Sequence, residues 1–349
     1  MTRPRIRKWV LALCILLFFA AVLFFADRLL RPKYRSVGQE GLLTAEYDAC
    51  AGETHQVLFL GDCEVYESFT PPTLWRDYGI TSYIRGNAQQ LIWQSYYLLR
   101  DVYRRETPEV VVFNVYAMRY GEPQNDAYNR MTLDGMRWST DKVAAIRASM
   151  TEDESFASYV FPLLRFHSRW KELSAEDFSY LFGGEPVSHN GYLMQTEAVP
   201  KTDPDDLYIP PLFDDASLPD VCWDYLDRIA SLCREHGSRL ILIKAPTNSW
   251  GYHWYDEWDE QIVAYADRNG LPYFNFIPLA DEIWIDWSTD SYDGGVHLNV
   301  SGAEKLTDFF GAILRNDFGL ADQRGDPALA ALWQDKLDRY LNQKGGPVS

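Results

Sequence analysis

Basic residues are scarce in this sequence of 349 residues, and the shortage excludes one large class of function. The chain has 33 Lys and Arg against 50 Asp and Glu, which gives a net charge of −17. Eight of the basic residues and only one Asp lie in the first 35 positions, so the remaining chain carries −24. Because such a surface repels a phosphate backbone, we expect no nucleic-acid partner.

The usual sequence signs of cofactor and metal binding are also missing. No glycine-rich fingerprint of a dinucleotide site follows a predicted strand, and no phosphate-loop lysine motif occurs. The six histidines have none of the spacings that are typical of metal ligands. We therefore expect no cofactor and no metal ion.

Cysteine is rare as well, and its five positions offer few disulfide pairs. Cys222 and Cys233 lie on one predicted helix, about 16 Å apart along its axis, which is beyond the reach of a disulfide. Cys14 lies in an apolar run near the N-terminus. Cys50 and Cys63 can pair only if Cys63 has no other role. Each remaining thiol is therefore a candidate reactive group.

A long apolar run, from Trp9 to Ala26, is the first feature that the chain does have. As a helix its 18 residues would extend about 27 Å, close to the thickness of a bilayer's hydrocarbon core. Bulky residues near its end, Leu23 to Phe25, do not suit a signal-peptidase site, so we expect an uncleaved, single-pass anchor. Four basic side chains flank each end; the free amino terminus favours a cytoplasmic N-terminus and an extracytoplasmic body.

The rest of the sequence suggests a division into four parts. Residues 1–33 form the cytoplasmic stub and the transmembrane anchor, and residues 34–52 form a linker. Residues 53–318 form an α/β domain, and residues 319–349 form a C-terminal amphipathic helix and tail. Within the domain, residues 118–218 are rich in Tyr, Trp, Pro and acidic residues and break its regular pattern. We interpret them as an insertion that forms a lid or substrate wall.

Apolar strands alternate with amphipathic helices through the rest of this domain. The alternation predicts a three-layer α/β/α fold, in which helices cover both faces of a central parallel sheet. The predicted strands are 56–61, 81–85, 109–116, 239–245 and 272–277. The predicted helices are 89–105, 140–150, 155–172, 219–236, 257–269, 301–314, which Ser301 would cap, and 328–343.

Polar residues occur at the carboxyl ends of these strands, where sites form in sheets of this type. The sequence GDCE, at 61–64, follows the first strand, and Gly86 and Asn87 follow the second. Asn114 is a polar residue inside the apolar third strand. The sequence DGGVHLN, at 293–299, follows the fifth strand and directly precedes a helix. We expect these residues to meet in one pocket.

These blocks, in this order, resemble those of the SGNH (GDSL-type) hydrolase superfamily. Cys63 stands where that family has its nucleophilic serine, and Gly86 and Asn114 match its second and third blocks. Asp293 and His297 are similar to its late Asp-x-x-His block, with one additional residue between them. The apolar run together with Gly-x-Cys-Glu also resembles the DltD-like branch, whose members transfer acyl groups to envelope polymers on the outer face of bacterial membranes.

The resemblance extends over residues 56–315 and implies an SGNH/flavodoxin-like α/β fold with acyl-transfer chemistry. Cys63 would be the nucleophile and His297 the general base. Asp293 would orient the imidazole, although the additional residue leaves Asp290 open as the alternative. The start of a helix and the neighbouring His297 would both lower the pKa of the Cys63 thiol.

The resemblance also implies an oxyanion hole and suggests where substrate would lie. The peptide N–H groups of Cys63 and Gly86 and the side-chain amide of Asn114 would bind the developing oxyanion. One candidate substrate contact follows Gly86, and three lie in the insertion, where a packed helix face is the alternative account. These candidate contacts are Asn87, His167, Arg169 and Trp170.

Two functions fit these residues. The first is a membrane-anchored, extracytoplasmic acyltransferase or esterase that acts on acyl esters of a cell-envelope polysaccharide or teichoic-type polymer through Cys63, His297 and Asp293. The resemblance implies that a polytopic membrane acyltransferase supplies its acyl group. The second is a catalytically inactive glycan-binding or scaffold protein, in which Cys63 marks a lost activity. The separation of the Cys63 sulfur from His297 discriminates between them.

Overall fold

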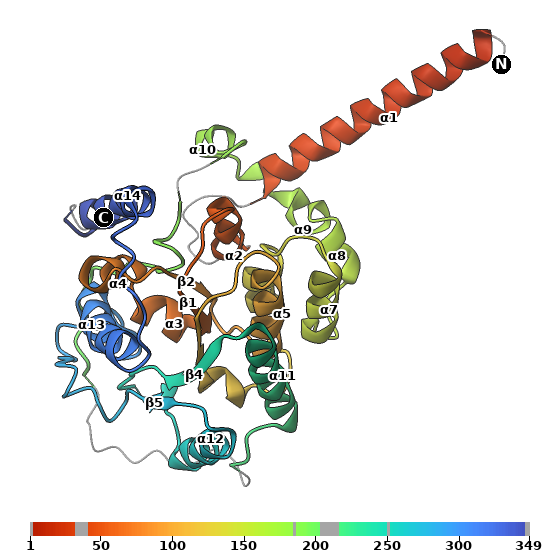
Figure 1. Cartoon of the computed structure of the whole chain (residues 1–349). Helices are drawn as coiled ribbons and strands as arrows, with labels where there is room; N and C mark the ends of the chain where they lie inside the picture. Colours follow the sequence, from red (N-terminus) through yellow and green to blue (C-terminus); the bar gives the residue numbers. More distant parts are fainter. Residues whose placement is uncertain (1–2, 32–40, 184–185, 203–215, 250–251, 346–349) are drawn as a thin grey trace.

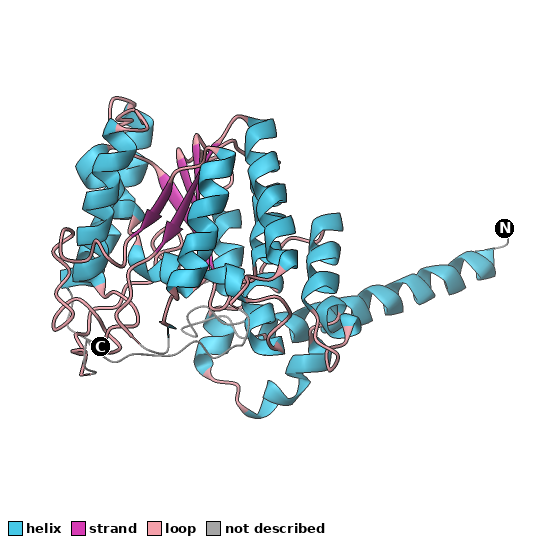
Figure 2. Cartoon of the chain, turned by 90° about the horizontal axis from the view of Figure 1, so that it is seen from below, coloured by secondary structure: helices cyan, strands magenta, loops and turns pink. Residues whose placement is uncertain are grey.

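The centre of the molecule is a five-stranded parallel sheet with the strand order β2-β1-β3-β4-β5. Helices lie on both faces of this sheet (Figures 1 and 2), so the predicted three-layer α/β/α fold is confirmed. The computed structural model describes residues 3–31, 41–183, 186–202, 216–249 and 252–345.

The strands are short, and all but β5 are almost wholly buried, as the apolar runs of a covered parallel sheet must be. In the register of β1 and β2, Gly61 lies opposite Gly86. Every predicted strand is present, with ends within two residues of the predicted ones. The strands are β1 (Val57–Gly61), β2 (Ser82–Gly86), β3 (Val110–Asn114), β4 (Arg239–Lys244) and β5 (Tyr273–Asn275).

The helices on the two faces bury two separate apolar clusters against the sheet. On one face lie α5 (Ile92–Val102), α11 (Asp220–His236) and α12 (Asp256–Asn269). On the other face lie α3 (Cys63–Ser68), α4 (Pro71–Tyr78), α13 (Val300–Asn316) and α14 (Pro327–Gly345).

The start of α13 corrects one prediction. Its N-cap is Asn299, whose side chain accepts hydrogen bonds from the backbone N–H groups of Ser301 and Gly302. Ser301 therefore lies inside the helix and does not cap it. The Asn299 amide in turn donates to two backbone carbonyls of neighbouring loops, at 3.0 and 2.7 Å. This cap fixes the loop that carries His297 immediately before the helix.

Residues 41–52 belong to the body, which corrects the predicted linker over 34–52. They form α2 (Leu42–Glu46) and the 3₁₀ helix η1 (Tyr47–Cys50). Leu43 and Tyr47 are buried, and the Tyr47 hydroxyl donates a hydrogen bond to Glu106 at 2.5 Å. The helical spacing of these two apolar residues was the available signal. The remainder of the predicted linker, residues 34–40, lies outside the described residues.

The described part of the insertion at 118–218 consists of short helices joined by loops. The predicted helix over 140–150 is present as α7, which packs against α5. The predicted helix over 155–172 is wrong as one element, because Pro162 cannot continue a helix and the chain forms three short ones there. The helices are α6 (Asp126–Leu133), α7 (Thr140–Ser149), α8 (Phe156–Val160), α9 (Leu163–Phe166), η3 (His167–Lys171) and α10 (Ala175–Ser179), after η2 (Val115–Arg119).

The N-terminal helix α1 (Arg3–Leu30) projects from the body (Figure 1). Its residues Ile6–Leu30 are long and apolar enough to cross a membrane, and none of that apolar stretch is buried inside the molecule. The C-terminal end of α1 contacts α9, η3 and α10 of the insertion. The predicted apolar run therefore forms a helix long enough to span a membrane, and its role as an anchor stays a prediction.

Candidate active site

A tight turn between β1 and α3 places Cys63 at the carboxyl edge of the sheet. Gly61 has a φ of +153°, and a Cβ atom there would lie 2.5 Å from Val65 and 2.8 Å from Asn114, so only glycine fits. The Asp62 side chain then accepts a hydrogen bond from the backbone N–H of Glu64 and caps α3. Cys63 is consequently the first residue of that helix.

The structure brings together the three residues predicted as a catalytic triad. The Cys63 and His297 side chains interact, and each shifts the pKa of the other, although Nε2 completes no hydrogen bond in the resting structure. Nδ1 of His297 lies 2.7 Å from Asp293 Oδ2, and the His297 backbone N–H donates to Asp293 Oδ1 at 2.8 Å. Asp293 therefore leaves Nε2 as the ring nitrogen available to the sulfur. Cys63 and Cys50 are both free, so the pairing that the sequence left open does not form.

Asp290, the other candidate acid, is engaged elsewhere. Its carboxylate accepts hydrogen bonds from Lys305 Nζ at 2.5 Å and from the Asp286 backbone N–H at 2.8 Å. The additional residue between Asp293 and His297 is accommodated by Gly294 and Gly295, whose φ values are +78° and +99°. Glycine adopts such values without strain, so the loop returns His297 to Asp293.

A second carboxylate, which the sequence analysis missed, also lies beside His297. Glu67 Oε2 is 3.4 Å from Nδ1, and Glu67 Oε1 accepts a hydrogen bond from the Tyr292 hydroxyl at 2.7 Å. Burial raises the pKa of Glu67 to about 7, while His297 and Tyr292 oppose the increase. Glu67 follows Cys63 by four residues on α3. This spacing, which places both side chains on one helix face, was the signal available in the sequence.

The electrostatics of the pair differ from the sequence-based expectation. Burial raises the pKa of the Cys63 thiol, and the Asp62 carboxylate adds to the increase, whereas His297 opposes it. For His297, burial alone would lower the pKa, but its interactions with Asp293, Cys63 and Glu67 raise it well above the ordinary value. The neighbours of His297 therefore favour its protonated, imidazolium form.

Two tyrosines enclose the pair of Cys63 and His297. The Tyr252 hydroxyl lies 3.6 Å from the sulfur, and the Tyr252 ring packs edge-on against His297 with centroids 5.0 Å apart. Tyr252 also stacks on Tyr116, which is fully buried. The Tyr292 ring stacks on His297 at 6.0 Å. These rings restrict the imidazole to one orientation, and no sequence motif identified them.

The side chain of Asn114 does not serve the oxyanion hole, contrary to prediction. Its Nδ2 donates to Asp62 Oδ1 at 3.0 Å and to Glu64 Oε2 at 2.9 Å, which uses both amide hydrogens. Its Oδ1 accepts a hydrogen bond from the Ala245 backbone N–H at 3.1 Å. Asn114 therefore links the cap of α3 to the end of β4.

A buried ion pair beneath Cys63 explains why a polar residue lies inside β3. Lys244 Nζ lies 2.7 and 2.9 Å from the two Glu64 carboxylate oxygens, and the two side chains are 0% and 1% exposed. Lys244 also donates to the Ala245 carbonyl and lies over the Tyr116 ring at 4.9 Å. Asn114 completes the hydrogen bonding of this cluster, which supports the turn before Cys63.

Gly86 lies directly beside the same turn. A Cβ atom at Gly86 would lie 3.1 Å from the carbonyl oxygens of both Gly61 and Asp62, so the two strand ends approach closely here. This close contact gives a physical reason for glycine at that position. The oxyanion role of the Cys63 and Gly86 N–H groups stays a prediction.

The four candidate substrate contacts lie elsewhere. Asn87 donates to the Thr44 hydroxyl of α2 at 2.8 Å, so its amide braces that helix. Arg169 donates to the carbonyl of the last α1 residue at 2.7 Å, and His167 Nδ1 lies 3.1 Å from a carbonyl of α9. Trp170 is exposed beside the same segment. Of the three insertion residues, Arg169 therefore lies at the base of α1, and contact of the four residues with substrate stays a prediction.

A different part of the insertion runs past the candidate site residues. The Leu193 backbone N–H donates to the Tyr66 carbonyl of α3 at 2.9 Å. Farther along, the Val199 N–H donates to the Ser291 carbonyl at 2.9 Å, and the Gly294 N–H donates to the Val199 carbonyl at 3.2 Å. Residues 193–199 therefore connect α3 to the loop that carries His297.

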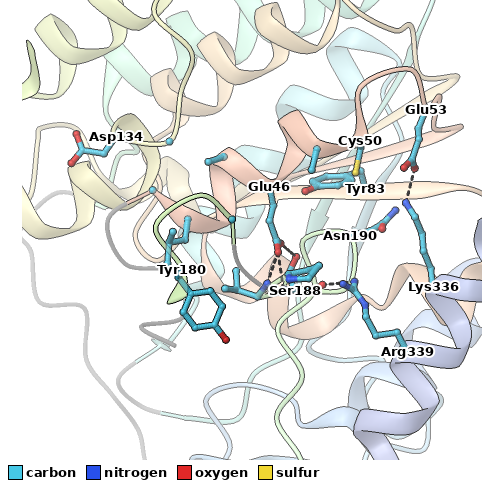
Figure 3. A pocket seen from close by; sticks show the side chains of 18 of the residues that line it. Glu46, Cys50, Glu53, Tyr83, Asp134, Tyr180, Ser188, Asn190, Lys336 and Arg339 are labelled. Carbon is cyan, nitrogen blue, oxygen red and sulfur yellow. Dashed lines mark hydrogen bonds and ion pairs between the residues drawn. The ribbon is translucent and has the colours of Figure 1, made fainter. Parts of the chain in front are cut away.

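A separate cavity of about 900 Å³ lies at the base of α1 (Figure 3). Its polar side chains already pair with one another, Glu46 with Ser188 and Lys336 with Glu53. Cys50 lines the cavity, but burial raises the pKa of that thiol to about 11, and none of the lining residues is a histidine. Among the described residues, this cavity therefore places no histidine beside the Cys50 thiol. Within the described ranges, no three His, Cys, Asp or Glu side chains are grouped as metal ligands.

No family model and no curated protein matches the sequence. The structure is similar to that of a putative acylhydrolase from Bacteroides fragilis, at 13% identity and a TM-score of 0.38, over 78% of this chain and 94% of the other. It is also similar to a GDSL-like lipase from Bacteroides thetaiotaomicron, at 14% identity and a TM-score of 0.36, over 79% and 95%. A family 3 carbohydrate esterase from Clostridium thermocellum matches at 13% identity and a TM-score of 0.35, over 80% and 99%.

Proposed function

We propose that this protein is a membrane-anchored acyltransferase or esterase of SGNH type, in which cysteine replaces the nucleophilic serine. It acts outside the cytoplasm on acyl esters of a cell-envelope polysaccharide or teichoic-type polymer, as the resemblance to the DltD-like branch implies. One observation carries the proposal: Cys63, the first residue of α3, and His297 both contact Tyr252, and Nδ1 of His297 lies 2.7 Å from Asp293.

The chemistry follows from the positions of these groups. His297 accepts the Cys63 proton as the sulfur attacks the acyl carbonyl, and the resulting imidazolium is stabilised by Asp293 and Glu67. The ester bond breaks, the leaving alcohol takes the proton from His297, and a thioester remains on Cys63. An acceptor hydroxyl or water then gives its proton to His297, attacks the thioester and releases the thiolate, which recovers that proton.

The thioester suits transfer between carriers at least as well as hydrolysis, because a thiolate leaves more readily than an alkoxide. A polytopic membrane acyltransferase would supply the acyl ester that Cys63 attacks, and α1 would hold the catalytic body beside it. A catalytically inactive glycan-binding protein is the second candidate. It is favoured by the burial of Cys63, which is 5% exposed and has a raised thiol pKa.

The experiment measures acyl-ester cleavage and acyl-enzyme formation by the full-length protein in detergent micelles. With p-nitrophenyl acetate as the probe, we expect release of p-nitrophenol and acetylation of Cys63, detected by mass spectrometry of its peptide. Cys63→Ala and His297→Ala should lower the rate by about 10³-fold or more. Cys50→Ala, which removes a thiol from the separate cavity, is the matched control and should keep the full rate.

The outcomes separate the two candidates. Full activity in Cys63→Ala contradicts the mechanism. A wild-type protein that neither cleaves the ester nor becomes acetylated supports the inactive glycan-binding protein. Retained cleavage in Cys63→Ser would indicate that the site accepts either nucleophile.

A further inference from the structure

Exposed apolar side chains gather on the part of the insertion that lies beside α1. They belong to α8, α9, η3 and α10 or directly follow these helices, and their exposed fractions range from 38% to 69%. We call them the apolar collar. Its members are Val160, Phe161, Leu164, Trp170, Phe178 and Phe182.

The collar is attached to α1 by specific contacts. The Phe182 ring packs edge-on against Phe25 of α1 with centroids 6.0 Å apart, and the Arg28 guanidinium lies over the same ring at 6.0 Å. Arg169, next to Trp170, donates to the last carbonyl of α1. Figure 1 shows α1 leaving the body beside α9 and α10.

The length of α1 fixes the depth at which the collar lies. The 25 residues Ile6–Leu30 extend over about 37 Å as a helix, which exceeds a hydrocarbon core of about 30 Å. With α1 across a bilayer, its last turn, which holds Asp27 and Arg28, would lie in the headgroup region, and Phe25 would lie at the boundary of that region. Since Phe182 packs on Phe25, the collar would lie at the same boundary.

The collar differs from single exposed apolar residues because its members are grouped. Trp284, on the loop between β5 and α13, is 82% exposed, and single apolar residues of this kind are common on soluble surfaces. The collar instead groups six apolar side chains on short helices around one end of α1. Aromatic residues with basic neighbours, such as Trp170 with Arg169 and Lys171, are typical of segments that lie at a membrane surface.

We propose that the apolar collar enters the headgroup region of the lipid bilayer and so holds the body in one orientation against the membrane surface. A single helix alone allows the body to tilt and rotate about its end. A second contact beside that end restricts both motions and sets the height of the active site above the bilayer. This inference rests on the anchoring role of α1 in the proposed function.

Lipid labelling of the full-length protein tests the inference. The protein is reconstituted below one chain per vesicle, so that no second copy covers the collar, in phosphatidylcholine and phosphatidylglycerol with a phospholipid that carries a diazirine near the start of its acyl chain. After irradiation, labelled peptides are located by mass spectrometry. We expect label in α1 and in residues 156–182, and only background label in the peptide that contains Trp284.

Paired variants supply the control. Phe161→Ser with Trp170→Ser should lower the labelling of 156–182 at least fivefold and leave that of α1 unchanged, whereas Trp284→Ser should change neither. Label in α1 with only background label in 156–182 overturns the collar inference and leaves the proposed anchor standing. Absence of label from α1 overturns both the anchor and the collar, and it leaves the ester-cleavage test of Cys63 unaffected.

Discussion

The second carboxylate at His297 makes the stability of this protein depend on pH in a way that one substitution tests. Glu67 is 4% exposed, and burial raises its pKa from 4.5 to about 7. Between these values the folded state holds a proton that the unfolded state has released, so the free energy of unfolding falls as the pH rises through this window. At 1.36 kcal/mol per pKa unit, ionised Glu67 costs about 3 kcal/mol above pH 7.

Glu67→Gln removes this cost and keeps the shape of the side chain. We expect the free energy of unfolding of the variant, relative to that of wild type, to rise by about 3 kcal/mol when the pH is raised from 5 to 8.5. The measurement is urea unfolding of both full-length proteins in detergent micelles at the two pH values. Asp62, whose pKa burial also raises to about 7, is present in both proteins, so its contribution cancels in the comparison.

Asp322→Asn is the matched control. The Arg324 side chain donates hydrogen bonds to this exposed carboxylate and holds its pKa at about 2, so it stays ionised at both pH values and its removal should not change the pH dependence. If the difference in unfolding free energy between wild type and Glu67→Gln is instead the same at pH 5 and pH 8.5, Glu67 does not titrate in this range and its burial does not raise its pKa to about 7.

Two further substitutions test the groups around Glu67. Asp293→Asn should lower kcat by less than the roughly 10⁴-fold that is typical when a lone orienting carboxylate is removed, because Glu67 remains 3.4 Å from His297 Nδ1. The double variant with Glu67→Gln should show the larger loss. Equal rates in the single and double variants would contradict this role of Glu67. Lys244→Met should lower the free energy of unfolding in urea by about 3–5 kcal/mol, since it leaves Glu64 buried without its partner, and the double variant with Glu64→Gln should recover much of that loss.

Features that depend on neighbours in the sequence were predictable. Continuous apolar runs located all five strands, because a strand covered on both faces buries every side chain. The apolar run from Trp9 to Ala26 located α1, since a membrane core sets the length of helix that crosses it. The order of short blocks selected Cys63, Asp293 and His297, and the structure places these three together.

Tertiary contacts decided the remaining features of the site, because each depends on partners far away in the sequence. Asn114 matched a block of the hydrolase pattern, yet its amide is bound by Asp62 and Glu64, about 50 positions earlier. The start of α3 would lower the pKa of the Cys63 thiol, whereas burial by distant elements raises it. The sequence by itself therefore determined the sheet, the long apolar helix α1 and the choice of Cys63, Asp293 and His297 as candidate site residues. Packing determined which side-chain amides keep a free N–H group, and it determined the direction in which the pKa of the Cys63 thiol shifts. It also placed Glu67 beside His297 together with Asp293. These features depend on burial and long-range contacts, which arise only when the chain folds.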